Sequence, residues 1–337
     1  MKILIVKLSS LGDVVHAMPA LQDIRRALPQ AQIDWVVERN FAALACRCSG
    51  VRRVIECELR SWRKSPLSAA TRRAWRDFKR ELQRESYDAV IDLQGLTKSA
   101  LISWLARLTT YGRRFGLAGA SEGSSFEAPA RWMADVAIRL PTHIHAVERS
   151  RQLCARSLGY AVPQQLSYGL TATARAAQDT DNDQAQSLAR RRPLVALVHG
   201  SSRADKQWPL SSWQALGQHL NRQGYALGLP QASAAEQQSA QQIAAALSQV
   251  EVWPHLQLDA LTDALAGCAG VVGVDSGLSH IAMALDLRLV QIYNFDTAWR
   301  TGPQQTSHQR SVFAQPTPTV EAVWQAWQLT ATHRTSA

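Results

Sequence analysis

Short apolar runs alternate with longer amphipathic stretches along the whole chain. In the first half the apolar runs predict buried strands near 2–7, 32–37, 52–55 and 88–92. In the second half they predict strands near 194–198, 225–229, 251–253, 270–274 and 288–292. Helices are predicted in the first half near 13–28, 68–84, 97–108 and 147–159. This alternation indicates parallel sheets with right-handed crossovers, so we predict an α/β fold in both halves.

The chain is long enough for two domains, with 337 residues of which 46% are hydrophobic. We predict an N-terminal domain over 1–170, a polar linker over 171–192 and a C-terminal domain over 193–337. The stretch 116–142 is rich in Gly, Ser and Ala, and we expect a long functional loop there. A last helix is predicted at about 318–329, because apolar residues recur there on one helical face.

Positive charge is confined to one half of the chain. Residues 1–170 contain 26 Lys and Arg against 15 Asp and Glu, whereas 171–337 contain 11 against 12. The N-terminal half therefore favours an acidic partner, such as nucleic acid, an anionic membrane surface or a polyanionic sugar. No nucleic-acid-binding motif is present, so we expect no nucleic acid. No apolar run has the length of a membrane span and the chain enters a strand at once, so we expect a cytoplasmic protein without a secretory signal.

The densest basic stretch lies on the predicted helix 68–84. On this helix Trp75, Phe78 and Leu82 form a narrow apolar stripe surrounded by cations. Packing of the stripe against its own domain is the favoured interpretation. Contact with an anionic membrane surface is the alternative.

Three strand-to-helix turns contain polar side chains suited to chemistry. They are Ser9-Ser10-Leu11-Gly12-Asp13, then His199-Gly200-Ser201-Ser202 with Lys206 beyond it, and Asp275-Ser276-Gly277-Leu278-Ser279-His280. Ligands of open α/β sheets bind at the carboxyl ends of strands, where these turns lie. The start of a helix beyond such a strand suits a phosphate group. The three turns therefore indicate a site for a phosphorylated ligand.

Each of these side chains also has a structural interpretation. Asp13 is either a general base or the N-cap of the following helix. Lys206 either binds an anion or is one more exposed lysine. Asp275 and Ser276 are able to cap the helix after them, and Gly277 permits close approach of a ligand. The first turn lacks G-x-G-x-x-G and the P-loop pattern, so it does not favour dinucleotide or Walker-type binding.

Seven blocks in order resemble the ADP-heptose:lipopolysaccharide heptosyltransferases, two-domain glycosyltransferases of the GT-B type. The likeness covers nearly the whole chain and is strongest to members that add the first heptose. The blocks are Lys7-x-Ser9-Ser10-Leu11-Gly12-Asp13-Val14-x-His16, Asp34-Trp35-Val36-Val37-Glu38, Arg60-Ser61-Trp62-Arg63-Lys64, Tyr87-Asp88-Ala89-Val90-Ile91-Asp92-x-Gln94-Gly95-Leu96-x-Lys98-Ser99, His145-Ala146-Val147-Glu148-Arg149, Asp205-Lys206-x-Trp208-Pro209 and Asp275-Ser276-Gly277-Leu278-Ser279-His280.

The resemblance implies a fold and a reaction. The fold is GT-B, with two Rossmann-like domains that face each other across a cleft and a terminal helix that packs back on the N-terminal domain. The reaction is an inverting transfer of heptose from ADP-L-glycero-β-D-manno-heptose to a Kdo hydroxyl of Kdo2-lipid A. The implied location is the cytoplasmic face of the inner membrane, with the anionic inner leaflet as a partner.

The resemblance also assigns residues. Asp13 is the implied catalytic base, and Lys206 stabilises the leaving diphosphate in place of a metal ion. The implied donor-binding residues are Ser201, Ser202, Lys206, Glu236, Asp275, Ser276, Gly277, Leu278 and His280. The implied acceptor-binding residues are Lys7, Ser10, Gly12, Arg60, Arg63, Lys64, Lys98 and Arg149. No metal is expected, because the nearest Asp-x-Asp pair, Asp181-Asn-Asp183, lies in the predicted linker. Ser61 replaces the second arginine of the family's Arg-Arg-Trp-Arg-Lys block.

Three other functions stay open. A second transferase of the family would add heptose to heptose instead of Kdo. A GT-B nucleotide-sugar epimerase would convert the donor without an acceptor. A non-catalytic polyanion-binding protein would explain the charge, but would leave Asp13 and Lys206 without a role.

Overall fold

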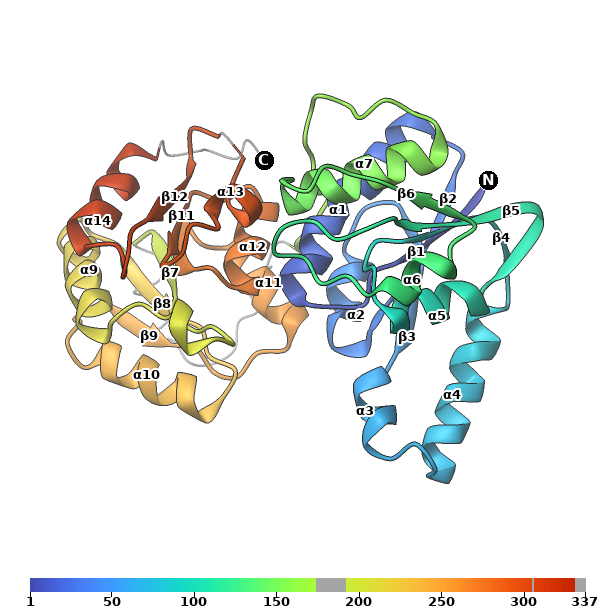
Figure 1. Cartoon of the computed structure of the whole chain (residues 1–337). Helices are drawn as coiled ribbons and strands as arrows, with labels where there is room; N and C mark the ends of the chain where they lie inside the picture. The colour runs from blue at the N-terminus through green and yellow to red at the C-terminus, as the bar shows by residue number, and fades with distance from the viewer. Residues whose placement is uncertain (174–191, 305, 331–337) are drawn as a thin grey trace. The chain divides into compact units, whose positions relative to one another are not determined.

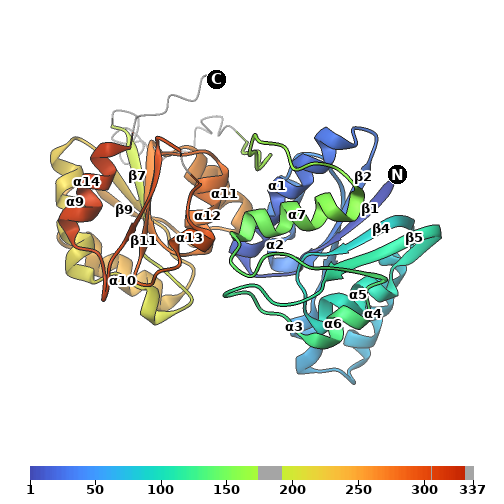
Figure 2. The ribbon, with the colours of Figure 1, turned by 45° about the horizontal axis from the view of Figure 1, so that its top comes forward.

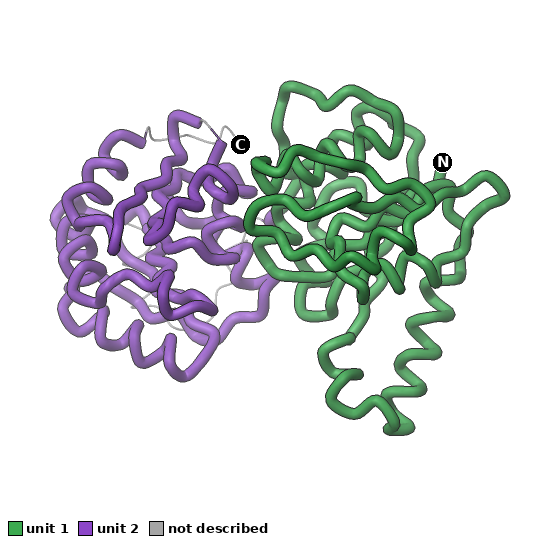
Figure 3. Tube along the Cα trace, in the orientation of Figure 1, with its two compact units in different colours: residues 1–171 green, residues 172–337 purple. Residues whose placement is uncertain are grey.

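The computed structural model describes residues 1–173, 192–304 and 306–330 (Figure 1). Most of the predicted linker, including Asp181 and Asp183, lies outside the described residues. The chain forms two compact units, Met1–Thr171 and Ala172–Ala337, shown in different colours in Figure 3.

Unit 1 contains a six-stranded parallel sheet in the order β3-β2-β1-β4-β5-β6. The strands are β1 (Lys2–Val6), β2 (Gln32–Glu38), β3 (Val51–Cys57), β4 (Ser86–Asp92), β5 (Arg107–Leu117) and β6 (Val136–Ile138). Four of these were predicted. β5 was missed because its charged and exposed positions obscure any apolar pattern, and β6 is only three residues long.

The helices of unit 1 cover both faces of this sheet. They are α1 (Leu11–Ala27), α2 (Arg39–Cys46), α3 (Leu59–Lys64), α4 (Ala69–Leu82), α5 (Thr97–Leu105), α6 (Ala128–Trp132) and α7 (Ala146–Leu158). Figure 2 shows α1 and α7 side by side on one face, with α4, α5 and α6 grouped elsewhere on the unit. The expected loop over 116–142 is shorter than predicted, because it contains α6 and β6.

The apolar stripe of α4 packs on its own unit, as the favoured interpretation predicted. Phe78 and Leu82 are buried in the hydrophobic core beside Trp62 of α3, and Trp75 packs against them. The rings of Trp62 and Trp75 meet edge to face, with centroids 5.4 Å apart. The cations of α4 are left on its outer surface.

Unit 2 repeats the strand order of unit 1. Its strands are β7 (Leu194–Val198), β8 (Ala226–Leu229), β9 (Val250–Val252), β10 (Gly270–Val274), β11 (Leu289–Tyr293) and β12 (Gln309–Phe313). They form a parallel sheet in the order β12-β11-β10-β7-β8-β9. The helical segments are η1 (Ala204–Lys206), α9 (Leu210–Arg222), α10 (Ala234–Ala244), α11 (Leu258–Ala266), α12 (Gly277–Ala284), α13 (Ala298–Thr301) and α14 (Val320–Leu329). The α/β fold class is therefore confirmed in both units, whereas β12 was not predicted.

The strand orders place the predicted turns at corresponding points. In each sheet the first strand lies beside the fourth, β1 beside β4 and β7 beside β10. The chain leaves these neighbouring strands toward opposite sides of the sheet, which opens a crevice at their carboxyl ends. The turns with Asp13, with Lys206 and with Asp275 all follow one of these central strands.

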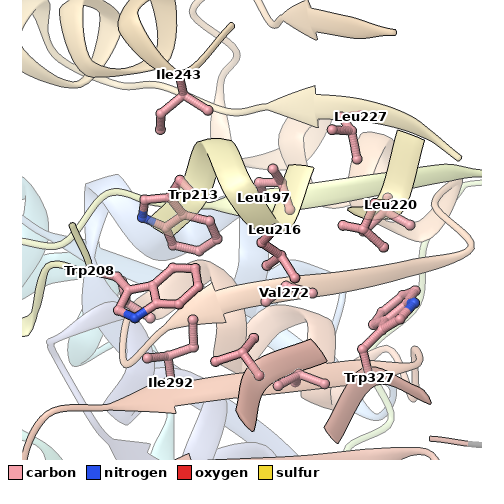
Figure 4. Close-up of a cluster of buried hydrophobic side chains, with 14 of the residues drawn as sticks. Leu197, Trp208, Trp213, Leu216, Leu220, Leu227, Ile243, Val272, Ile292 and Trp327 are labelled. Atoms are coloured by element: carbon pink, nitrogen blue, oxygen red, sulfur yellow. The ribbon is translucent and has the colours of Figure 1, made fainter. Parts of the chain in front are cut away.

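The amphipathic helix predicted at about 318–329 is α14, and its packing is described within unit 2; packing back on the N-terminal domain stays a prediction. Val323, Trp324 and Trp327 of α14 are buried in the core of unit 2, where α14 contacts α9, β11 and β12 (Figure 4). The guanidinium of Arg288 lies 3.6 Å above the Trp327 ring centroid. The apolar face of α14 is therefore used by its own unit, in the position that α7 occupies beside α1 in unit 1.

Candidate active site

The turn after β1 positions Asp13 at the start of α1. Ser10 is the N-cap of this helix, and Asp13 is its third residue. One oxygen of the Asp13 carboxylate, Oδ2, accepts hydrogen bonds from the Ser10 backbone N–H at 3.1 Å and from the Ser10 hydroxyl at 3.0 Å. Asp13 is thus not the N-cap, although it closes a capping box with Ser10. Gly12 lies in the same first turn.

The other oxygen of Asp13, Oδ1, faces two cations. Lys7 Nζ lies 3.4 Å away and Arg149 Nη2 lies 3.9 Å away. Both cations are buried and held by other groups, since Lys7 donates to the Leu93 carbonyl and Arg149 donates to the Ser121 hydroxyl. The Asp13 side chain itself remains one-third exposed. A partly exposed carboxylate therefore lies beside two buried positive charges.

These charges determine the protonation state of Asp13. Burial acts to raise the pKa of Asp13, but Lys7, the Ser10 N–H, His16 and Arg149 together hold the pKa well below its usual range. Burial and the neighbouring Arg149 lower the pKa of Lys7, against the attraction of Asp13. Asp13 is therefore ionised at neutral pH.

The turn after β4 fixes this arrangement from the neighbouring strand. The Gln94 side-chain carbonyl accepts hydrogen bonds from the backbone N–H groups of Leu8 and Ser9, at 3.1 and 3.2 Å. Asp92 is buried and accepts from the backbone N–H groups of Gln94 and Gly95 and from the Ser99 hydroxyl. Burial raises the pKa of Asp92 to about 6. Both residues belong to the block Tyr87–Ser99 that resembles the family, but the sequence predicted no role for Asp92 or Gln94.

The predicted acceptor residues form two groups within unit 1. Lys7, Ser10, Gly12 and Arg149 surround Asp13. Arg60, Arg63 and Lys64 are exposed on α3, and Lys98 lies at the start of α5. Arg63 and Lys98 line a pocket of about 620 Å³ whose apolar wall includes Trp62, Trp75 and Leu101.

Glu38, at the end of β2, lies beside the second group and was not predicted. Burial raises the pKa of its carboxyl group, and the charges of Arg60 and Lys98 act in the opposite direction. The Glu38 carboxylate therefore interacts electrostatically with a cation of α3, Arg60, and with a cation at the start of α5, Lys98.

In unit 2, an ion-pair network brings three predicted donor residues together. Lys206 Nζ donates to Asp275 Oδ2 at 2.6 Å, and His280 Nε2 lies 3.3 Å from Asp275 Oδ1. Asp275 is buried, which acts to raise its pKa, but His280 and Lys206 hold the pKa well below its usual range. Asp275 is therefore a fixed anion that orients the side chains of Lys206 and His280.

The turn after β10 leads directly into α12, which begins at Gly277. Ser276 is the N-cap residue, but its hydroxyl makes no capping hydrogen bond, contrary to the sequence prediction. The Ser279 hydroxyl instead donates to the Val274 carbonyl at 2.7 Å. The start of α12, with Leu278 in its first turn, thus leaves backbone N–H groups without a side-chain cap.

The turn after β7 is held on both sides of Lys206. The Asn294 side-chain amide donates to the carbonyls of Asp205 and Gln207, both at 2.9 Å. Trp208 is buried and its indole N–H donates to the Pro318 carbonyl. Lys206 therefore projects from a short segment with a fixed backbone. Ser201 is partly exposed and Ser202 is exposed on the same turn.

Glu236 reaches the same turn from the first turn of α10. A methyl group added at Gly200 would lie 2.5 Å from Glu236 Oε1, so glycine is required for this approach. The other carboxylate oxygen of Glu236 accepts from the Ala232 N–H at 2.7 Å, and His199 Nε2 contacts the Glu236 carbonyl. The structure thus brings Glu236 to the carboxyl end of β7, beside Gly200.

The two units contain complementary chemistry. Unit 1 holds an ionised, accessible carboxylate, and unit 2 holds an oriented lysine and a helix start, which suit a diphosphate. In the described ranges, no three His, Cys, Asp or Glu side chains are grouped so as to hold a metal ion. No described helix has both the length and the apolar character to cross a membrane.

The fold and these sites define a two-domain α/β glycosyltransferase of the GT-B type. Residues 75–324 match the model of glycosyltransferase family 9 (heptosyltransferase). The chain is 38% identical to lipopolysaccharide heptosyltransferase 1 of Pseudomonas aeruginosa, over 87% of this chain and 78% of that protein. It is 37% identical to lipopolysaccharide heptosyltransferase 1 of Escherichia coli K12, over 87% and 88% of the two chains.

A solved structure of E. coli heptosyltransferase WaaC with ADP-2-deoxy-2-fluoro heptose is also similar. It superposes with a TM-score of 0.78 at 35% identity, covering 96% of this chain and 98% of that one. The chain belongs to glycosyltransferase family 9, the heptosyltransferases, and is an enzyme of lipopolysaccharide biosynthesis.

Proposed function

We propose that this enzyme transfers heptose from ADP-L-glycero-β-D-manno-heptose to a Kdo hydroxyl of Kdo2-lipid A. The observation that carries the proposal is the state of Asp13, an ionised and partly exposed carboxylate beyond the carboxyl end of β1. The names and identities of the two heptosyltransferase 1 relatives support the first-heptose reaction over transfer to heptose.

Asp13 acts as the general base of a single displacement. It accepts the proton of the Kdo hydroxyl as that oxygen bonds to the anomeric carbon of heptose, and the bond from that carbon to the diphosphate breaks. The configuration is therefore inverted, and ADP leaves with the bonding electron pair. A base of low pKa suffices, because the hydroxyl loses its proton late, when it has become strongly acidic.

Lys206 and the start of α12 stabilise the charge that develops on the departing diphosphate. Asp275 holds Lys206 and His280 in place before the reaction, so little reorganisation is needed. Ser201 and Ser202 contribute hydroxyl donors, and Glu236 faces the ribose of the nucleoside. In this proposal positive side chains and a helix start take the part that a metal ion plays in other transferases.

The acceptor is recognised by the cations of unit 1. Arg149 and Lys7 lie beside Asp13, where the Kdo carboxylates approach, whereas Arg60, Arg63, Lys64 and Lys98 take the lipid A phosphates. The enzyme then works peripherally at the cytoplasmic face of the inner membrane, where its lipid acceptor resides.

Incubation with ADP-heptose and Kdo2-lipid A, followed by mass spectrometry of the lipid, tests the proposal. We expect the mass of one heptose to be added. Transfer only to an acceptor that already contains heptose would identify the second transferase of the family. Donor conversion without any acceptor would identify an epimerase.

A further inference from the structure

Unit 1 exposes two tryptophans on neighbouring helices. Trp104 of α5 is 57% exposed and Trp132, the last residue of α6, is 80% exposed. They are the only tryptophans classed among the exposed large hydrophobic residues in the described part of the chain. The two helices contact each other and lie side by side in Figures 1 and 2. Exposed aromatic groups on adjoining elements are typical of an interaction surface.

Unit 1 also has a cationic pocket close to the end of α5. It has a volume of about 650 Å³ and lies where the end of α4 meets the start of β5. Its lining includes five cations, Arg76, Lys79, Arg80, Arg84 and Arg107. Glu81, the one carboxylate in the lining, pairs with Arg53 at 2.8 Å and lies 3.9 Å from Arg84, so the lining keeps a positive excess. Gln83, also in the lining, donates to the carbonyl of Leu105 at 2.8 Å, so the pocket borders the end of α5, where Trp104 lies.

This pocket is separate from the chemistry of Asp13. Arg107 opens β5 and pairs in register with Ser86, the first residue of β4. The pocket therefore lies at the amino ends of these parallel strands, whereas Asp13 follows the carboxyl end of β1. An anion in this pocket does not occupy the acceptor position beside Asp13.

The same surface also extends toward the predicted acceptor cations. Leu101 is 40% exposed, lies one helical turn before Trp104, and lines the pocket that contains Arg63 and Lys98. Along α4, Arg72 lines that acceptor-side pocket and Arg76 lines the cationic pocket. The outer surface of α4, α5 and α6 thus connects the two pockets, and we call it the α4–α6 face.

We infer that the α4–α6 face docks on an anionic phospholipid bilayer. Lipid phosphates occupy the cationic pocket, and Trp104 and Trp132 enter the headgroup region, which is where tryptophan side chains prefer to lie in membranes. The inference rests on the proposed function, because it places a lipid acceptor next to Arg63 and Lys98. A soluble polyanion would use the cations but leave both indoles in water. Stable membrane binding requires both an apolar and a basic contribution, and this face supplies both.

Co-sedimentation with vesicles tests the inference. The wild-type enzyme is mixed with phosphatidylethanolamine vesicles containing phosphatidylglycerol, and in parallel with phosphatidylcholine vesicles. We expect binding to the anionic vesicles only. Both Trp104→Ser/Trp132→Ser and Lys79→Gln/Arg80→Gln should weaken it by about tenfold or more, since each nearby cation contributes about 1 kcal/mol. Added salt should weaken the wild type and the tryptophan variant, because both retain the cations.

Matched variants in unit 2 serve as controls. Phe313→Ser/Leu329→Ser removes exposed apolar groups, and Arg222→Gln/Arg310→Gln removes exposed cations. Both should bind vesicles within about twofold of the wild type, and unfolding temperatures should show that all variants are folded. Equal binding by the tryptophan variant would overturn the inference. Binding of tripolyphosphate, but not of vesicles, by the wild type would also overturn it. A dimer of the wild type that Trp104→Ser/Trp132→Ser converts to monomers would show instead that this face is a protein interface, and would overturn it too.

Turnover on two acceptors separates this inference from the proposed function. Variants of the α4–α6 face should lose transfer to Kdo2-lipid A embedded in vesicles, but keep transfer to the water-soluble, deacylated acceptor. If the wild type transfers heptose to neither acceptor yet binds anionic vesicles, the proposed function is wrong and the docking surface stands. If the wild type transfers heptose to both acceptors without binding vesicles, the proposed function stands and the docking surface is wrong.

Discussion

The turns after β1 and β10 each pair an aspartate with a lysine, yet the two pairs differ. Asp275 is 7% exposed and both its oxygens are engaged, one by Lys206 at 2.6 Å and the other by His280 at 3.3 Å. Asp13 is 33% exposed, and its Oδ1 lies no closer than 3.4 Å to Lys7. Both carboxyl groups have a lowered pKa and are ionised at neutral pH.

The difference lies in which partner is free to act. In unit 2 the aspartate is buried and the lysine is 21% exposed, so the lysine is the partner that a ligand is able to reach. In unit 1 the lysine is 3% exposed and the aspartate is the accessible partner. In the proposed mechanism the same pair of residue types therefore supplies a base in one unit and a fixed cation in the other.

The largest expected effect is that of Asp13→Asn on turnover. The amide still accepts the Ser10 hydrogen bonds but accepts no proton, so turnover should fall about 10²–10⁴-fold. Donor binding and unfolding temperature should change little, because the proposed nucleotide contacts lie in unit 2 and Asn preserves the helix start. Steady-state assays, donor titration and thermal melting measure the three quantities.

Asp13→Ala completes this test. If Asp13 only supports the helix start, Asn should work nearly as well as Asp, and Ala alone should lower the melting temperature. Near-normal turnover of the Asn variant would remove Asp13 from catalysis, whatever the Ala variant did.

Lys206→Ala should weaken transition-state stabilisation by about 2–4 kcal/mol, the scale of one well-placed donor in a preorganised site. The loss should be visible in kcat/KM and should be only partly restored by Arg, whose planar fork differs from an ammonium group. A variant within about twofold of the wild type would show that Lys206 is an ordinary partly exposed lysine.

Asp275→Asn tests directly whether Asp275 orients Lys206. Removing the buried anion takes one charged hydrogen bond from Lys206, and we expect about 1.5–3 kcal/mol lower stability together with weaker donor binding. Because its folded-state pKa lies below the usual value of about 3.9, this pair contributes stability at neutral pH and loses it on further acidification. Urea unfolding at pH 7 and pH 3 measures both effects, and equal losses at the two pH values would argue against an ion pair.

The contribution of Asp92 to folding stability should depend on pH in the opposite direction to those of Asp13 and Asp275. Its pKa is raised to about 6, so the folded protein retains a proton that the unfolded chain has lost between about pH 4 and pH 6. Stability from this group therefore falls as pH rises through that window, by at most about 1.4 kcal/mol per pH unit. Asp92→Asn preserves the contacts of Gln94 and Ser99, and should flatten this decline in urea titrations.

Chelation should have the smallest effect. If Lys206 and the start of α12 neutralise the diphosphate, transfer should proceed at an unchanged rate in excess EDTA. Activity that disappears with EDTA and returns with Mg²⁺ would show that the positive groups of unit 2 do not suffice.

Much of the fold follows from local pattern. The central strands β1, β7 and β10 are almost wholly apolar and β4 contains the run Ala89–Ile91, so their type and parallel arrangement were predictable. β5 and β12 have charged or exposed residues at many positions, and an edge or half-exposed strand leaves little periodic signal. The amphipathic face of α14 was predicted, but periodicity does not specify which core receives it.

The site was predictable where a motif combined a strand end with polar residues. Lys206, Asp275 and His280 do come together, and Lys7 does lie beside Asp13. Ser121 and Glu38 were missed, because their roles depend on contacts across long stretches of sequence. Gln94 had a signal in its block, but a side chain that holds the backbone of another strand is not visible without the register of β1 and β4.

The burial of α14 in the core of unit 2 affects how such enzymes can diversify. Because the division places 1–171 in one unit and 172–337 in the other, the chain passes between them once. Each half is then a contiguous stretch that includes its own closing helix, α7 or α14. A single crossover in the gene could therefore exchange one half for that of a relative without cutting through a hydrophobic core. If unit 1 binds the acceptor and unit 2 the donor, as proposed, exchange of the N-terminal half would change the acceptor and leave recognition of the ADP-sugar intact.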